Sequence, residues 1–172
     1  PIGWKDPFWA VVMGIEHERI HLETSSVLMR QHALHYVKPH PAWPPCAEHG
    51  EPPANGLVDI PAGTVTLGRS FDEPIYGWDN EYGTHRAEVP AFQAARYLVT
   101  NREYLGFVEA GGYADDSVWD EEGLGWKRYA RAEHPTFWVP DTAGWKLRLM
   151  TEEVPMRWDW PVEVNCLEAR AF

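Results

Sequence analysis

The sequence predicts an α+β fold, in which one long helix precedes a region of short strands and short helices. Three observations support this class: helical apolar periodicity without proline after Pro7, a proline-rich segment over residues 38–56, and short runs of strand-forming residues after it. At 172 residues, the chain is long enough for one domain, or for one domain and part of another.

The first expected element is a helix that starts at Asp6 and Pro7 and continues from Phe8 to about Tyr36. Asp6 offers a side-chain acceptor to the free amides of the first turn, and Pro7 has no amide hydrogen to lose there. Apolar residues form stripes on two sides of this helix, which is typical of a helix inside a bundle. The sequence contains no partner helices for it, so we expect the chain to be an internal piece of a larger protein.

The region after this helix changes character. Prolines and glycines interrupt every periodicity over residues 38–56 and predict a linker. Residues 57–68 then predict two strands around Pro61, and residues 92–99 predict another.

Two helix starts follow. Thr100 with Glu103 forms a capping-box pattern and predicts a short helix that stops near Gly111, and Asn165 with Glu168 repeats the pattern close to the end of the chain. We expect Trp119, Trp126 and Trp138, between these starts, to be core or loop anchors and not a substrate cage. The run YGWDNEYG is expected to form a turn in which Asp and Asn side chains bond to their own backbone.

Charge and composition exclude several classes of partner. The formal net charge is −11 and the calculated pI about 5.1, which opposes binding to nucleic acid or to an anionic membrane surface. Cys46 and Cys166 form no C-x-x-C pair, so neither a disulfide framework nor a thiolate zinc site is indicated. No segment has the length of a membrane helix or the pattern of a signal peptide. We expect a cytoplasmic protein whose partners are small molecules.

His17 and His21 are the clearest candidate site residues, because positions four apart on a helix can bring two imidazoles to one cation. The run H-E-x-x-H also fits a zinc hydrolase with Glu18 as general base, although the expected third ligand is not evident downstream. Two further interpretations are a histidine pair bonded within a core, and an iron site whose third histidine lies outside this segment. Spacing alone does not choose between zinc and iron.

Longer motifs carry a resemblance. His17 and His21 with Glu23 form H-x-x-x-H-x-E, which resembles the motif of the sulfoxide synthases that join a cysteine sulfur to a histidine-derived imidazole. The resemblance continues through IEHERIHLETSSVLMRQ, VDIPAGTVTLGR, YGWDNEYGTH, YLVTNREYLGFVEAGGY, HPTFWVP and WDWPVEVNCLEARAF. The chain is identified as a member of the 5-histidylcysteine sulfoxide synthases of ovothiol biosynthesis. Enzymes of the related ergothioneine branch usually carry glutamine where this chain has Ile20.

The resemblance implies a domain order. Residues 1–37 would be the C-terminal helix of a DinB-like bundle, and residues 38–56 a linker. Residues 57–172 would be the first part of a formylglycine-generating-enzyme-like domain with a C-type-lectin-like fold. In many ovothiol enzymes a C-terminal methyltransferase domain follows.

The resemblance also implies Fe(II) as cofactor, held by three histidines, of which two correspond to His17 and His21. Glu23 and Thr24 would support these ligands from the second shell, while the third ligand and the catalytic residues would lie outside this segment. The implied substrates are cysteine, histidine and O2. The alternatives are an ergothioneine-type synthase, the zinc hydrolase that uses Glu18, and a non-catalytic lectin-like binding module.

Overall fold

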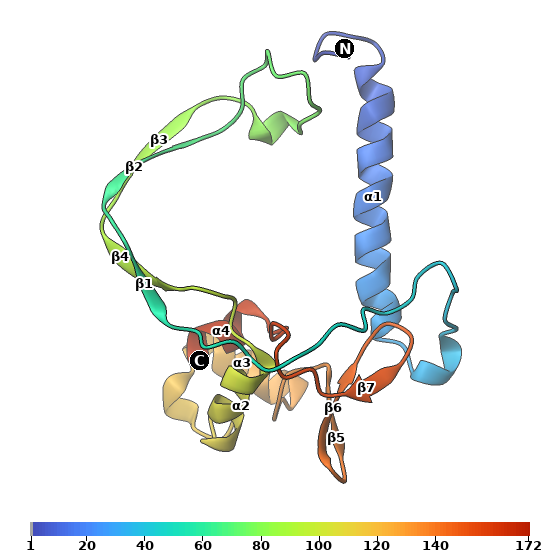
Figure 1. The fold of residues 1–172 in the computed structure, drawn as a ribbon, viewed down its shortest axis with the longest axis vertical. Helices are drawn as coiled ribbons and strands as arrows, with labels where there is room; N and C mark the ends of the chain where they lie inside the picture. Colours follow the sequence, from blue (N-terminus) through green and yellow to red (C-terminus); the bar gives the residue numbers. More distant parts are fainter. Residues whose placement is uncertain (1) are drawn as a thin grey trace. The chain divides into compact units, whose positions relative to one another are not determined.

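The computed structural model describes residues 2–172 and confirms the α+β class. The chain forms two compact units (Figure 1). The first unit comprises Pro1–Gln31 and Leu57–Ala94, and the second comprises His32–Gly56 and Ala95–Phe172. None of the helices in the described part of the chain has the length and apolar character needed to span a bilayer.

The long helix of the first unit is α1 (Trp9–Arg30). The side chain of Asp6 accepts a hydrogen bond from the Phe8 amide at 2.9 Å, as its position before Pro7 predicts. The expected continuation to about Tyr36 is wrong. The amide of Gln31 closes the last turn on the carbonyls of Leu28 and Met29, and the chain is extended at Ala33 before the short 3₁₀ turn η1 (Leu34–Tyr36).

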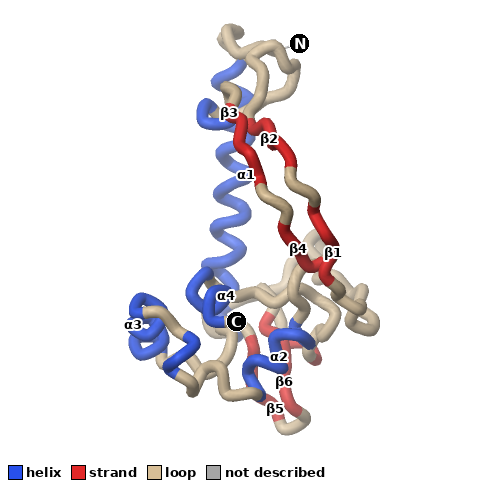
Figure 2. The backbone as a smooth tube through the Cα atoms, turned by 90° about the vertical axis from the view of Figure 1, so that its left-hand side faces the viewer, coloured by secondary structure: helices blue, strands red, loops and turns tan. Residues whose placement is uncertain are grey.

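Two pairs of strands complete the first unit. β1 (Leu57–Ile60) pairs with β4 (Phe92–Ala95), and β2 (Gly63–Leu67) pairs antiparallel with β3 (His85–Val89). The two strands expected around Pro61 are therefore confirmed. β1 and β2 do not pair with each other. They follow one another on one side of a two-stranded ribbon, and β3 and β4 form the other side (Figure 2).

The loop between β2 and β3 contains the 3₁₀ turn η2 (Asp79–Glu81) and is closed at its base by two glycines. Gly68 has a φ of +107°, a conformation that side chains disfavour. A Cβ atom at Gly68 would lie 2.1 Å from the carbonyl oxygen of Gly83, so the two backbones approach each other at a distance that only glycine allows.

The second unit contains the remaining helices and a three-stranded antiparallel sheet. Its helical elements are α2 (Asn101–Glu109), η3 (Asp116–Val118), α3 (Glu121–Ala130) and α4 (Cys166–Ala171). Its sheet has the order β5-β6-β7, with β5 (Trp138–Asp141), β6 (Gly144–Arg148) and β7 (Glu153–Pro155).

Both predicted capping boxes are present in this unit. Thr100 accepts a hydrogen bond from the Glu103 amide at 3.2 Å, and the Glu103 carboxylate accepts one from the Thr100 amide at 2.8 Å. Asn165 and Glu168 exchange the same pair of bonds, at 2.9 and 2.8 Å, at the start of α4. These reciprocal bonds satisfy amides that have no partner inside the helix.

The core of the second unit is aromatic. Trp138 is 2% exposed, and its indole nitrogen donates to the side chain of Asn101 at 3.1 Å. Asn101 in turn donates to the carbonyl of Arg157 at 2.8 Å, so one buried amide ties α2 to β5 and to the segment after β7. The buried apolar side chains of this core are Tyr104, Leu105, Tyr113, Trp119, Trp138, Leu147, Val154 and Met156.

The proline-rich segment is held by hydrogen bonds to the rest of the second unit. The amide of Gly50 donates to Asp159 at 2.7 Å, and the indole nitrogen of Trp160 donates to the carbonyl of Glu48 at 2.8 Å. Asn55 exchanges two hydrogen bonds with the backbone of Tyr97, at 3.0 and 3.2 Å. The segment predicted to be a linker therefore follows a defined path within this unit.

Candidate metal centre

The two candidate ligands lie on α1, one helical turn apart. The ring centroids of His17 and His21 are 4.5 Å apart and the rings meet edge to face at 89°. Both residues are exposed, so an ion could approach them without displacing other side chains of the described chain. The helix brings the two imidazoles side by side, as their spacing predicts.

This separation fits two ligands of one metal ion. Two imidazoles that bind a cation at about 2.1 Å, with nitrogens at about 90° to each other, have ring centroids roughly 4.6 Å apart. The observed separation is 4.5 Å, so rotation of the two rings suffices to direct one nitrogen of each at a common point. Neutral imidazole is a suitable ligand for iron, zinc and copper alike.

Thr24 and Glu23, predicted to support the pair, both form hydrogen bonds within α1. The hydroxyl of Thr24 donates to the carbonyl of Ile20 at 2.9 Å, so its one hydrogen is already used. Towards a histidine, Thr24 could act only as an acceptor of a ring N–H. The side chain of Glu23 is exposed, and its backbone carbonyl accepts from Ser26 at 2.7 Å.

The structure supplies two ligands and not a third. Among residues 2–172, no group of three His, Cys, Asp or Glu side chains is placed to hold a metal ion. Glu16, directly before His17, instead forms an ion pair with Arg19 at 2.7 Å. The third ligand, expected outside this segment, stays a prediction.

The loop after β2 contacts the first residue of α1. Tyr76 contacts the ring of Trp9 at a centroid distance of 4.9 Å. Burial, and then the carboxylate of Glu16, raise the pKa of Tyr76. This contact was not predicted from the sequence, although the density of aromatic residues in YGWDNEYG is a signal for it.

The turn predicted for YGWDNEYG is present, but a different side chain closes it. Asp79 accepts from the amide of Asn80 at 3.0 Å, while Glu81, and not Asn80, closes the turn by accepting from the amide of Trp78 at 2.6 Å. The core tryptophans behave as expected: Trp119 and Trp138 are buried, and Trp126 packs against them.

Comparison with known proteins shows the family to which most of the chain belongs. A sequence model of the sulfatase-modifying factor enzyme 1-like domain matches residues 45–166, well over half of the chain. The chain belongs to this family. The family match begins inside the proline-rich segment and covers residues of both units. The histidine pair lies outside the family match.

Individual relatives extend the comparison. The hercynine oxygenase of Mycolicibacterium smegmatis is 33% identical over 176 residues, which covers 97% of this chain and 38% of that protein. The hercynine oxygenase of Mycolicibacterium thermoresistibile is 39% identical over 103 residues, 59% of this chain and 22% of that protein. The formylglycine-generating enzyme of Thermomonospora curvata is 37% identical over 73 residues, 42% of this chain and 22% of that protein. The chain thus spans less than half the length of these relatives.

Proposed function

We propose that this chain is part of an Fe(II)- and O2-dependent sulfoxide synthase that couples L-cysteine to L-histidine, as in ovothiol biosynthesis. The observation that carries the proposal is the exposed pair His17 and His21, at 4.5 Å, on a chain that aligns over 97% of its length with a hercynine oxygenase. A zinc hydrolase that uses Glu18 would leave this similarity unexplained.

The proposed reaction balances without a further reductant. The thiol hydrogen of cysteine and the C5 hydrogen of the imidazole leave as water with one oxygen atom of O2. The other oxygen atom becomes the sulfoxide oxygen, and a carbon–sulfur bond joins the two amino acids. Ferrous iron, when bound, supplies the electron-transfer chemistry that links the reduction of O2 to this oxidation.

The described residues have a binding role in this proposal. His17 and His21 would hold the ion through one nitrogen each, and neutral imidazoles leave the ferrous charge available to attract a cysteine thiolate. Because the two rings lie on one face of α1, they would leave room for substrates to reach the ion. Thr24, as an acceptor, would orient the ring N–H of a ligand.

The exposed side of α1 supports a helical bundle in the whole protein. Within the described residues, α1 has no buried side chain, and Ile15, Leu22 and Leu28 are more than half exposed. Apolar side chains at helical spacing are stabilised by packing against other helices. We therefore propose that α1 is the last helix of a DinB-like bundle, and that a histidine of that bundle completes the site.

The choice of imidazole substrate has two candidates. The relatives named hercynine oxygenase favour the ergothioneine branch, in which the histidine carries a trimethylated amine. Ile20, before His21, favours the ovothiol branch, because glutamine usually stands there in ergothioneine enzymes. We propose histidine as the substrate and a hercynine-type substrate as the second candidate.

The test uses the full-length protein loaded with Fe(II) under anaerobic conditions. Oxygen uptake is then followed with cysteine and either histidine or hercynine, and products are identified by mass spectrometry. We expect a histidine–cysteine sulfoxide that disappears in His17→Ala and in His21→Ala. His49→Ala, which removes an exposed histidine of the proline-rich segment, is the matched control and should retain activity. Zinc-dependent hydrolysis that requires Glu18, without oxygen uptake, would refute the proposal.

A further inference from the structure

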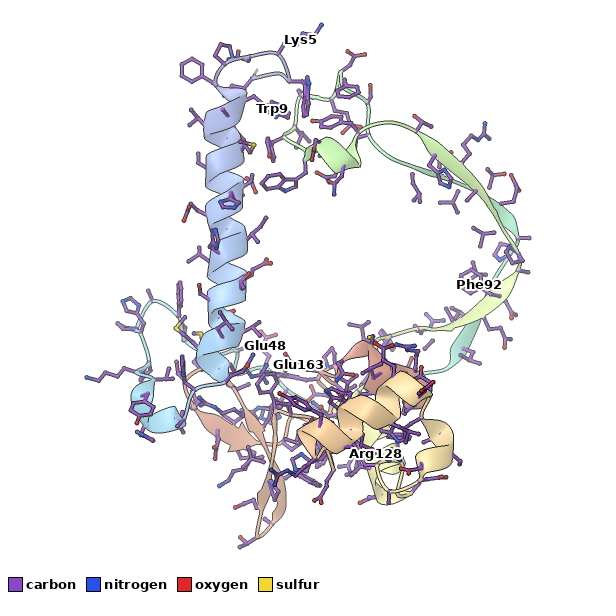
Figure 3. All side chains as sticks on the ribbon, turned by 180° about the vertical axis from the view of Figure 1, so that it is seen from behind. Lys5, Trp9, Glu48, Phe92, Arg128 and Glu163 are labelled. Atoms are coloured by element: carbon purple, nitrogen blue, oxygen red, sulfur yellow. The ribbon has the colours of Figure 1, made fainter. Side chains whose placement is uncertain are left out.

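Five aromatic side chains form a cluster between two segments of the first unit that lie far apart in the sequence. Trp4 comes from the segment before α1 and Trp9, labelled in Figure 3, is the first residue of α1. Phe71, Tyr76 and Tyr82 come from the loop between β2 and β3. We refer to these five residues as the aromatic cluster.

The rings of the aromatic cluster meet in the geometries that aromatic pairs prefer. Trp4 lies edge-on to Trp9, Phe71 and Tyr82, with centroid distances of 5.4, 5.5 and 4.9 Å. Phe71 stacks on Tyr82 at 4.6 Å with only 8° between the ring planes. Offset stacking and edge-to-face contact are both favourable arrangements, so the cluster is a specific contact and not only shared burial.

The loop that carries three of these rings is held in shape by one arginine. The guanidinium group of Arg69 donates to the carboxylate of Glu73 at 3.0 Å and to the carbonyl of Tyr76 at 2.8 Å. It also lies 5.9 Å from the centre of the Tyr82 ring. The loop therefore presents its aromatic side chains to α1 from a fixed framework.

The cluster contacts the same helix that carries the histidine pair. Trp9 precedes His17 by about two helical turns, a rise of roughly 12 Å. An α-helix is stiff over this length, so a contact that fixes the end at Trp9 also fixes the direction in which the pair points. Further along the helix, Ile20 and Leu22 are exposed and give no such restraint within the described residues.

We propose that the aromatic cluster positions His17 and His21 for metal binding, with Phe71 as a positioning residue. This inference rests on the proposed function, because it requires the pair to bind a metal. If α1 is free to move, it must become ordered when His17 and His21 bind a metal ion. The entropy lost in this ordering weakens the affinity for the metal. By linkage, a metal bound at the pair must stabilise the cluster to the same extent.

The test measures binding of Co(II), a spectroscopic probe, to the full-length protein without substrate. Phe71→Ala should weaken Co(II) binding by about tenfold, in the range of residues that support metal ligands indirectly. Phe71→Tyr keeps the ring and should restore affinity. Phe92→Ala is the matched control, because Phe92 is similarly exposed, at 48% against 56% for Phe71, and lies on β4 of the same unit.

The outcomes separate this inference from the proposed function. Wild-type affinity in Phe71→Ala, together with loss of binding in His17→Ala, would overturn the positioning role alone. Failure of the wild type to bind Co(II), or binding that persists in His17→Ala, would overturn both. If Phe71→Ala does not fold, hydrogen exchange of the wild type decides: Co(II) should slow exchange over residues 69–83, and unchanged exchange would overturn the role.

Discussion

Replacing Tyr113 with phenylalanine should destabilise the second unit through one buried hydrogen bond. The hydroxyl of Tyr113 donates to the carboxyl of Glu168 at 2.5 Å, and the two residues are 7% and 2% exposed. Burial raises the pKa of Glu168, although the hydrogen bonds from Tyr113 and from the Asn165 amide oppose this rise. Phenylalanine fills the same space without the hydroxyl, so the substitution removes this bond together with the longer contact to the Tyr104 hydroxyl.

The expected loss is about 1.5–3 kcal/mol in the free energy of unfolding, the range for a hydrogen bond to a charged group. The lack of solvent favours the upper part of that range, because water cannot replace the lost donor. Tyr104 provides the comparison. It is 1% exposed, but its hydroxyl lies 3.4 Å from that of Tyr113, so Tyr104→Phe should cost only about 0.5–1 kcal/mol.

Equilibrium urea unfolding of the wild type and both variants at neutral pH measures these losses. The m-values should be equal, so that the midpoints report stability alone. Equal losses in Tyr113→Phe and Tyr104→Phe, or a loss below about 0.5 kcal/mol in Tyr113→Phe, would refute the reasoning.

Three further predictions concern the pH dependence, the backbone and a helix cap. Glu168 has a raised pKa in the folded state, so wild-type stability should fall as pH rises from about 4.3 through that pKa, and urea unfolding of Glu168→Gln should lack this fall. Gly68→Ala should cost more than about 2 kcal/mol by thermal unfolding, since its Cβ meets the Gly83 carbonyl at 2.1 Å, whereas Gly125→Ala, with no atom nearby, should be stabilising. Thr100→Ala should cost about 1 kcal/mol in urea unfolding through the lost cap, and no change would contradict the cap's role.

The sequence predicted the features that depend on neighbours a few residues apart. The caps at Thr100 and Asn165 were predictable because their hydrogen bonds join residues three apart. The proximity of the two rings at His17 and His21 was predictable for the same reason, since helical geometry alone brings positions four apart together. Metal binding by this pair stays a prediction.

Features that join distant segments were not predictable in this way. The end of α1 at Arg30 has no proline or glycine to mark it, so the sequence pattern gave a helix that was too long. The proline-rich segment was expected to be a linker because its composition excludes regular structure. Its path is set by bonds such as that from Gly50 to Asp159, which lie 109 residues apart.

The amino-acid sequence by itself determined the α+β class, the local helix starts and the juxtaposition of His17 and His21, because short-range geometry fixes each of them. Only the tertiary structure brought Tyr113 to Glu168 and Phe71 to Trp4. Such contacts depend on which surfaces meet when the chain packs, and residues of the same type elsewhere in the sequence offer the same chemistry. Which of the possible long-range contacts form is decided by the burial of apolar surface over the whole molecule, and not by the residue type at a single position.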